Sequence, residues 1–193
     1  MRYVVFDLET QNIFDDVARR DPTLLSISVA SVYDSQTNTY HTVAIDELST
    51  LWPIFEEADA LVGYNSNYFD IPLLNKYYPG DLTKIPSIDI LESIKNSLGK
   101  RIRLDAVAEA TLGKKKTANG LQAVAWWKEG KIDLIKKYCE MDVQVTKEVF
   151  EYAKKNGYVK YREGLTVRNI TLDTSSWDEE SHNSGTMTHA LPF

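Results

Sequence analysis

The chain has little of what would indicate a secreted or membrane protein. It contains one cysteine, Cys139, in 193 residues, so no disulfide can form within the chain. No apolar run approaches the roughly 20 residues of a membrane-spanning helix, and the amino terminus enters a strand-like segment without the regions of a signal peptide. The histidines, His41, His182 and His189, lack the spacing of a metal site. We therefore expect a soluble cytoplasmic protein that binds no membrane.

Positive charge is also scarce. The 22 Lys and Arg residues are outnumbered by 28 Asp and Glu residues, which gives a net charge of -6. This charge repels a polyanion at long range, so we do not expect non-specific coating of nucleic acid. A nucleic-acid ligand would have to be held by local basic patches or by bound cations. With 43% hydrophobic residues, the chain is long enough for one globular domain with a sizeable core.

A strand near the amino terminus ends in two carboxylates. Residues 3–10, with the sequence YVVFDLET, form an apolar, β-branched and aromatic run typical of a strand buried on both faces. Successive side chains of a strand point to opposite faces, so Asp7 and Glu9 point to the same side, about 7 Å apart along the chain. They could supply two hard oxygen ligands, although acidic residues also close strands simply by facing water.

The remaining pattern predicts a mixed α/β protein, with an antiparallel meander followed by helices and a further strand. Strands are predicted at 3–10, 24–32, 39–45 and 60–64. Helices are predicted at 46–58 with Asp46 as the cap, and at 71–78, 91–98, 104–112, 121–127 and 132–155.

The composition changes near residue 163. From there Ser, Thr, Asn, Asp and His are frequent and apolar residues are few. We therefore predict a domain at 1–162 and a C-terminal tail at 163–193 that is flexible or binds a protein partner. Deletion of residues 173–193 is expected to leave the fold and the metal-dependent reaction intact. Trp177 and the segment Leu191-Pro192-Phe193 are the residues best suited to dock on the domain or on a partner.

Two further acidic residues occur where ligands are often found. Asp70 follows the strand predicted at 60–64, at its junction with a helix, which is a position typical both of ligand sites and of helix caps. Asp142 lies on the apolar stripe of the helix predicted at 132–155. A polar side chain in a core costs several kcal/mol without a partner, so we expect a metal or a hydrogen-bonding network at Asp142. Tyr138, four residues earlier, shares the same face.

Together these segments resemble a known family. FDLET at 6–10, NSNYFD at 65–70 and YCEMD at 138–142 are similar, in this order, to the three motifs of DEDD-type 3′–5′ exonucleases. The resemblance is to the proofreading exonuclease domain of family B DNA polymerases and to related stand-alone nucleases, and it extends over about residues 1–155. It implies a ribonuclease H-like fold, with a central mixed β-sheet flanked by helices.

The same resemblance implies a set of metal ligands. Clustered carboxylates repel one another unless they are protonated or neutralised by cations, and hard oxygen ligands select Mg²⁺ or Mn²⁺. Two ions about 3.5 to 4 Å apart would stabilise both the attacking and the leaving oxygen of phosphodiester hydrolysis. Asp7 would bridge the two ions, Glu9 and Asp142 would complete one site, and Asp70 would bind the second ion through water.

Tyr138 is the fifth residue that the resemblance identifies as catalytic. Tyrosine four residues before the last aspartate marks the tyrosine subtype, whereas the histidine subtype has its histidine five residues before, where this chain has Lys137. A tyrosine of ordinary pKa, about 10, is a poor general base, so Tyr138 is expected to orient the attacking water. An ordinary half-buried helix tyrosine is the alternative.

Residues beside the motifs are candidates for holding the substrate. Aromatic side chains stack on single-stranded bases, although Phe69 could equally belong to the core. Basic clusters at 100–103 and 114–116 could bind phosphates, but such runs are also common on solvated faces. The candidate substrate-binding residues are Leu8, Thr10, Tyr64, Asn65, Phe69 and Lys114.

The sequence thus predicts an Mg²⁺- or Mn²⁺-dependent 3′–5′ exonuclease of single-stranded nucleic acid, with DNA favoured over RNA as the partner. The polarity, and nucleoside 5′-monophosphates as products, are implied by the resemblance. An RNA-trimming exoribonuclease and a non-catalytic nucleic-acid-binding or scaffold module remain as alternatives. The intact acidic positions argue against the module, because a protein without need of cations would gain stability by losing them.

Overall fold

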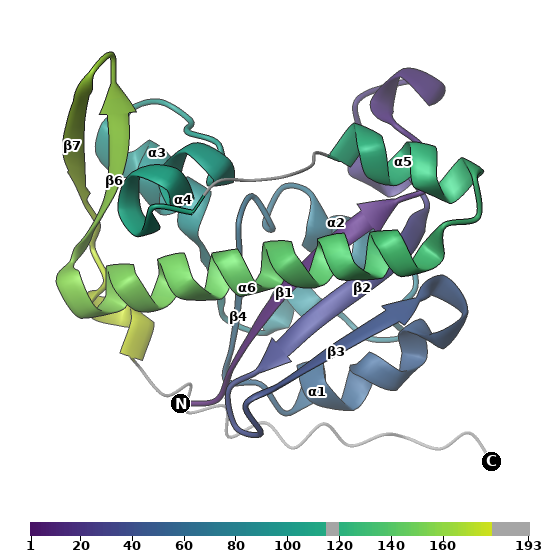
Figure 1. Ribbon diagram of the computed structural model, residues 1–193. Helices are drawn as coiled ribbons and strands as arrows, with labels where there is room; N and C mark the ends of the chain where they lie inside the picture. Colours follow the sequence, from purple (N-terminus) through teal and green to yellow (C-terminus); the bar gives the residue numbers. More distant parts are fainter. Residues whose placement is uncertain (115–119, 179–193) are drawn as a thin grey trace.

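A computed structural model of the chain describes residues 1–114 and 120–178. A five-stranded sheet in the order β3-β2-β1-β4-β5 lies at its centre (Figure 1). The strands are β1 Tyr3–Thr10, β2 Ile27–Asp34, β3 Thr39–Ala44, β4 Ala60–Gly63 and β5 Ser87–Asp89. β1, β2 and β3 form an antiparallel meander, whereas β4 and β5 run parallel to β1. The predicted mixed sheet is therefore confirmed.

Helices cover both faces of this sheet (Figure 1). The α-helices are α1 Trp52–Glu56, α2 Asp70–Leu74, α3 Ile90–Leu98, α4 Leu104–Leu112, α5 Gly120–Lys128 and α6 Ile132–Asn156. Short 3₁₀-helices are Phe14–Asp16, Pro22–Leu24, Ile45–Leu51, Leu82–Lys84 and Ser175–Asp178. The long helix α6 packs across β1 and β2 on one face together with α3 and α4, while α1 and α2 pack on the other face.

Alternate residues of β1 face two different cores. Val4, Phe6 and Leu8 pack with α1 and α2, whereas Val5 packs under α6. Side chains of a strand alternate, so the next residues on the Val5 side are Asp7 and Glu9. The apolar residues of β1 thus anchor the strand in both cores. At the end of the strand, the same alternation directs the carboxylates of Asp7 and Glu9 toward α6.

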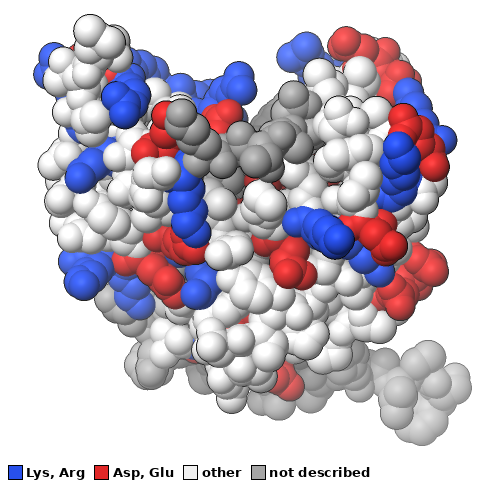
Figure 2. All heavy atoms as spheres, viewed as in Figure 1, with Lys and Arg blue, Asp and Glu red and all other residues white. Residues whose placement is uncertain are grey.

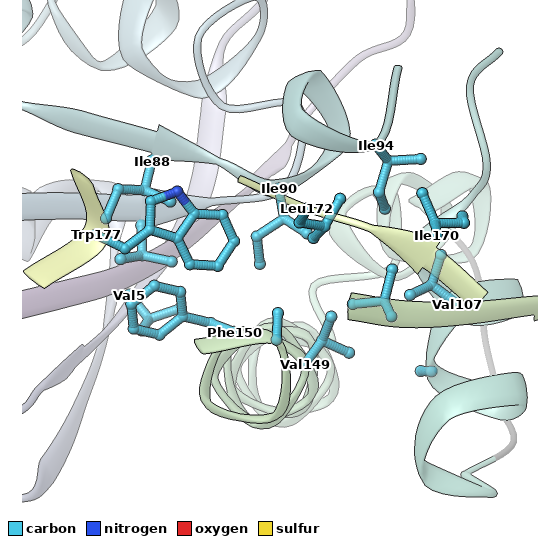
Figure 3. Close-up of a cluster of buried hydrophobic side chains, with 14 of the residues drawn as sticks. Val5, Ile88, Ile90, Ile94, Val107, Val149, Phe150, Ile170, Leu172 and Trp177 are labelled. Atoms are coloured by element: carbon cyan, nitrogen blue, oxygen red, sulfur yellow. The ribbon is translucent and has the colours of Figure 1, made fainter. Parts of the chain in front are cut away.

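The chain continues past α6 into a hairpin that the sequence pattern did not predict. β6 Tyr158–Glu163 pairs antiparallel with β7 Thr166–Thr171. Figure 3 shows Ile170, Leu172 and Trp177 in the same buried cluster as Val5 and Phe150. The indole of Trp177 stacks on the ring of Phe150, with 5.3 Å between centroids.

The tail predicted from residue 163 begins inside the β6–β7 hairpin, so the predicted domain boundary does not coincide with a break between structural elements. That deletion of residues 173–193 leaves the fold intact stays a prediction, and the buried side chain of Trp177, which is 4% exposed, is the observation that speaks against it. A few widely spaced apolar residues are enough to attach this segment, because Ile170, Leu172 and Trp177 each pack into the core cluster that the preceding helices and strands share. The remainder of the predicted tail, 179–193, lies outside the described residues.

The helix predicted at 46–58 is divided in two. Ile45–Leu51 form a 3₁₀-helix, and only α1 is α-helical. Pro53 has no N–H with which to continue an α-helical hydrogen-bond ladder, so the two segments remain separate. Ala44, not Asp46, is the N-cap residue of the first segment.

Other bounds differ by a few residues. β2 begins at Ile27, because Pro22–Leu24 form a 3₁₀-helix instead of the start of a strand. The helix predicted at 71–78 is α2, which ends at Leu74. β5 was not predicted, since three residues are too few to show a period. No helix within the described ranges is both long and apolar enough to span a bilayer.

Candidate active site

The end of β1 and the middle of α6 bring three carboxylates together. Oxygen atoms of Asp7, Glu9 and Asp142 all lie within 4.8 Å of one another. Glu9 and Asp142 are buried, at 7% and 8% exposure, although both are acidic. The predicted placement of Asp7 and Glu9 on one side of the strand, and of Asp142 on the inner stripe of its helix, is confirmed.

Tyr138 lies one helical turn before Asp142 and donates its hydroxyl hydrogen to the Asp142 carboxylate. Its ring packs edge-on against Trp126 at 6.2 Å between centroids. Burial, followed by the negative charges of Asp142, Glu9 and Asp7, raises the pKa of Tyr138 well above its ordinary value. In the absence of metal the hydroxyl therefore stays protonated and acts as a hydrogen-bond donor.

Asp70 is the first residue of α2, directly after the loop that leaves β4. β4 pairs with β1 only as far as Val5, and beyond this point the Leu8 N–H donates to the Asp70 carboxylate. Burial, with a smaller contribution from the charge of Asp89, raises the pKa of Asp70 to about 7 in the absence of metal. The N-cap of α2 is Phe69, so Asp70 is not the helix cap that its sequence position allowed.

Asp89 organises the loop that presents Asp70, a role that sequence analysis missed. Its Oδ1 accepts hydrogen bonds from the N–H groups of Asn65 at 2.9 Å and Leu91 at 2.9 Å, and its Oδ2 accepts one from Asn67 at 3.1 Å. Asn65 has a φ of 70°, in the left-handed region, and this bond helps to hold it there. The signal in the sequence was an Asp before an apolar helix, which predicts only an N-cap.

Cys139 also contacts the acidic cluster. Its thiol is fully buried and lies 3.3 Å from the carbonyl oxygen of Asp7 and 3.7 Å from Asp7 Oδ2. Burial and the nearby charge of Asp7 raise the pKa of this thiol far above its usual range, so it remains an S–H donor. The Cys139 side chain therefore links α6 to Asp7 of the acidic cluster.

The carboxylates open into a cleft with a volume of about 660 Å³. Figure 2 shows the molecule hollowed between two lobes at this place. One wall comes from the segment after β1 and from α5, and the opposite wall includes Arg103 at the start of α4. Arg20, which was not predicted, also lines the cleft. The acidic centre is thus flanked by two cations.

Most of the predicted substrate-binding residues line this cleft, in different ways. The Leu8 side chain is 5% exposed and belongs to the core on the other face of β1. Thr10 Oγ1 donates to the carbonyl of Asn12 at 2.8 Å. The Tyr64 hydroxyl donates to the carbonyl of Ile102 at 2.7 Å. The predicted residues that line the cleft are Leu8, Thr10, Tyr64, Asn65 and Phe69.

Lys114 is placed elsewhere. Its ammonium group forms an ion pair of 2.6 Å with Glu148 on α6, and it does not line the cleft formed by the described residues. The other two lysines of this predicted basic cluster, Lys115 and Lys116, lie outside the described residues. The structure therefore does not bring Lys114 together with the acidic cluster of Asp7, Glu9 and Asp142.

The donor set fits a divalent cation. Ligand oxygens bind Mg²⁺ at about 2.1 Å and larger cations at about 2.4 Å, so oxygens that share one ion lie within about 4 to 5 Å of one another. The 4.8 Å limit for Asp7, Glu9 and Asp142 satisfies this condition. Carboxylate oxygens prefer hard ions such as Mg²⁺ or Mn²⁺. Asp70 lines the same cleft and could bind a second ion.

Comparison with known proteins agrees with this architecture. The family B DNA polymerase from the hyperthermophilic archaeon Pyrobaculum calidifontis has a similar structure, with a TM-score of 0.61 and 20% identity over 79% of this chain and 24% of the polymerase chain. At this identity the likeness concerns the fold alone. No curated protein matches the sequence. A family model of the RNase_H superfamily matches residues 4–156, a range that covers most of the chain and includes Asp7, Glu9, Asp70 and Asp142, so the chain belongs to the RNase H superfamily.

Proposed function

We propose that this protein is a metal-dependent 3′–5′ exonuclease that hydrolyses single-stranded DNA to nucleoside 5′-monophosphates. Membership of the RNase H superfamily supports a nuclease that uses divalent metal. The observation that carries the proposal is the meeting of Asp7, Glu9 and Asp142 within 4.8 Å at the base of a cleft that Asp70 and Tyr138 also line. The 3′–5′ polarity rests on the order and composition of the three sequence motifs.

The residues of the cleft divide the chemistry among them. Asp7, Glu9 and Asp142 would hold divalent cations, and Asp70 would complete the ligand set. Two bound ions would lower the pKa of the attacking water and stabilise the charge that develops on the phosphate. Tyr138 keeps its proton, so it would orient the attacking water by its hydroxyl instead of removing a proton from it.

The size of the cleft favours the end of a single strand as substrate. A volume of about 660 Å³ lies in the range of sites that enclose one small ligand, roughly 300–1,000 Å³, and suits a terminal nucleotide better than a duplex. Phe69 packs edge-on against Phe14 at 5.9 Å, and both rings line the cleft. Such aromatic groups are suited to contact an unpaired base.

The experiment is incubation of a 5′-labelled single-stranded DNA with Mg²⁺, with Mn²⁺ or with chelator, beside a matched RNA. We expect a ladder that shortens by single nucleotides from the 3′ end, requires the metal and disappears with Asp142→Asn. Products cut at internal positions, or binding without cleavage, would refute the exonuclease proposal. Faster shortening of the RNA would replace DNA by RNA as the substrate.

A further inference from the structure

We infer that a basic surface next to the cleft binds the phosphates of the substrate strand beyond the nucleotides held in the cleft. This inference rests on the proposed function and extends it to the path of the strand. We call this surface the hairpin surface. Its exposed cations, from the loop before α4 and from the β6–β7 hairpin, are Lys100, Arg101, Arg103, Arg162 and Arg168.

The loop at 100–103 connects the cleft to the hairpin. On the cleft side Arg103 lines the cleft, and the Arg101 guanidinium donates to Asn65 Oδ1. On the hairpin side, Lys100 Nζ lies 3.8 Å from a carboxylate oxygen of Glu163 and 5.0 Å from the centroid of the Tyr161 ring. Cations therefore continue from the wall of the cleft onto the hairpin, which gives one strand a continuous path.

The charge of the hairpin differs from that of the whole chain. Residues 158–171 include Lys160, Arg162 and Arg168 against a single acid, Glu163, in a protein with a net charge of -6. Arg168 and Lys100 both pair with the Glu163 carboxylate, at 2.6 Å and 3.8 Å. One negative charge is therefore shared by two positive charges, and the group of three keeps a net positive charge. Figure 2 shows Lys and Arg gathered on the lobe that holds β6, β7 and α4. Local clustering of this kind is what an acidic protein needs in order to hold a polyanion.

The outer part of the hairpin has no role in the core. Val159 and Ile170 are buried, but Leu165 in the turn is 100% exposed and Val167 is 44% exposed. The fully exposed Leu165 side chain, at the tip of the hairpin between Arg162 and Arg168 in the sequence, buries no apolar surface and so adds no stability to the fold. Apolar side chains among cations are suited to contact bases and sugars while the cations contact phosphates.

The test compares a long and a short substrate. The variant Arg162→Gln/Arg168→Gln removes two exposed cations of the hairpin, and Lys84→Gln/Lys136→Gln removes two cations that lie outside the cleft lining and the hairpin. Hydrolysis of a dinucleotide and of an oligonucleotide of about 16 nucleotides, the upper end of typical single-strand site sizes, is measured at several salt concentrations.

We expect the hairpin variant to raise KM for the long substrate only, and to reduce the slope of log affinity against log salt by about 1.4, since each phosphate contact contributes about 0.7. Its kcat, its hydrolysis of the dinucleotide and its melting temperature should match those of the control variant. Equal KM values for the long substrate in the two variants would overturn the inference, as would equal losses on both substrates. Failure of the unmodified protein to hydrolyse either substrate would instead refute the proposed function.

Discussion

At the scale of single residues, Tyr138 and Asp7 show how different surroundings assign different roles. Asp7 is one of three carboxylates whose oxygens lie within 4.8 Å of one another and is a ligand candidate, whereas Tyr138 only donates a hydrogen bond to one of them. We predict that Asp7→Ala abolishes hydrolysis, whereas Tyr138→Phe lowers kcat by about 10² to 10³ fold, the usual effect of losing one preorganised donor. Steady-state kinetics under saturating Mg²⁺ would measure both. An equally complete loss in the two variants would contradict the assignment of Tyr138 as an orienting group.

Asp70 provides a second prediction, based on pH. Its pKa is about 7 in the folded, metal-free protein and near 3.8 when unfolded, so the folded state holds the proton more tightly. The stability that this proton provides is complete below about pH 4 and is lost as the pH rises through about 7, at roughly 1.4 kcal/mol for each unit of pKa difference.

We therefore expect the free energy of unfolding of the metal-free protein to fall between pH 4 and pH 7 more steeply than that of Asp70→Asn. The asparagine keeps an oxygen that can accept the Leu8 N–H, so the comparison isolates the charge. Urea denaturation across this pH range, with chelator present, provides the measurement. Parallel curves for the two proteins would show that burial does not raise the pKa of this carboxyl.

Asp7, Glu9 and Asp142 could be placed from the sequence because the position of each depends on a local period, whereas Asp70 was placed by its strand–helix junction. Alternation along a strand places Asp7 with Glu9, and helical spacing places Tyr138 with Asp142. Asp89 and Cys139 were not recognised, because their contacts join segments that are far apart in the chain. Asp89 meets a loop 22 to 24 residues away, and Cys139 meets Asp7 across 132 residues.

At the scale of elements, long and strongly periodic segments were predicted well and short ones were not. α6 begins at Ile132, where it was predicted, and ends one residue after the predicted end. β7 was missed because only Ile170 among its residues is buried, so it lacks the alternation of a half-buried strand. In β6 the alternation is limited to the first four residues, where Val159 and Tyr161 are buried, and this is too short a pattern to stand out after a long helix. The turn signal was present in Gly164, whose φ is 60°.

The segment after β7 gives a prediction at this scale. Trp177 lies in a short 3₁₀-helix, is 4% exposed and stacks on Phe150 of α6, so it attaches the end of the described chain to the main core. Trp177→Ala should lower the free energy of unfolding by about 3 to 5 kcal/mol, as is usual for loss of a large buried aromatic. Equilibrium denaturation would measure this, with the fully exposed Leu165→Ala as the control. A change below about 1 kcal/mol would mean that this segment is not part of the core in solution.

At the scale of the whole molecule, the acidic cluster links stability to metal. Three carboxylates within 4.8 Å repel one another in the absence of cations. We predict that Asp7→Asn unfolds at a higher temperature than the unmodified protein in chelator, and at a lower temperature in excess Mg²⁺ or Mn²⁺. A ligand that binds only the native state adds RT ln(1 + [L]/Kd), roughly 2.7 kcal/mol at a hundredfold excess over Kd, and the variant should gain much less.

Thermal melting of both proteins, with and without metal, checks this prediction. Asp59→Asn is a suitable control, because this carboxylate accepts a hydrogen bond from the Arg2 N–H at the opposite end of β1 and lies outside the cleft. If the two melting temperatures of Asp7→Asn and of the unmodified protein responded equally to metal, the carboxylates would not be ligands.

The position of β1 in the sheet has a consequence for how the site opens. β1 is the central strand and pairs on both sides, with β2 and with β4. Asp70, in contrast, lies where a loop meets the first turn of the five-residue helix α2. Amide hydrogens of the central strand should exchange with solvent only when the whole domain unfolds, while those between Asn65 and Asp70 should exchange through smaller and more frequent openings. Asp7 and Glu9 on β1 would then stay in place as a fixed half of the candidate metal site, whereas Asp70 would move with its loop.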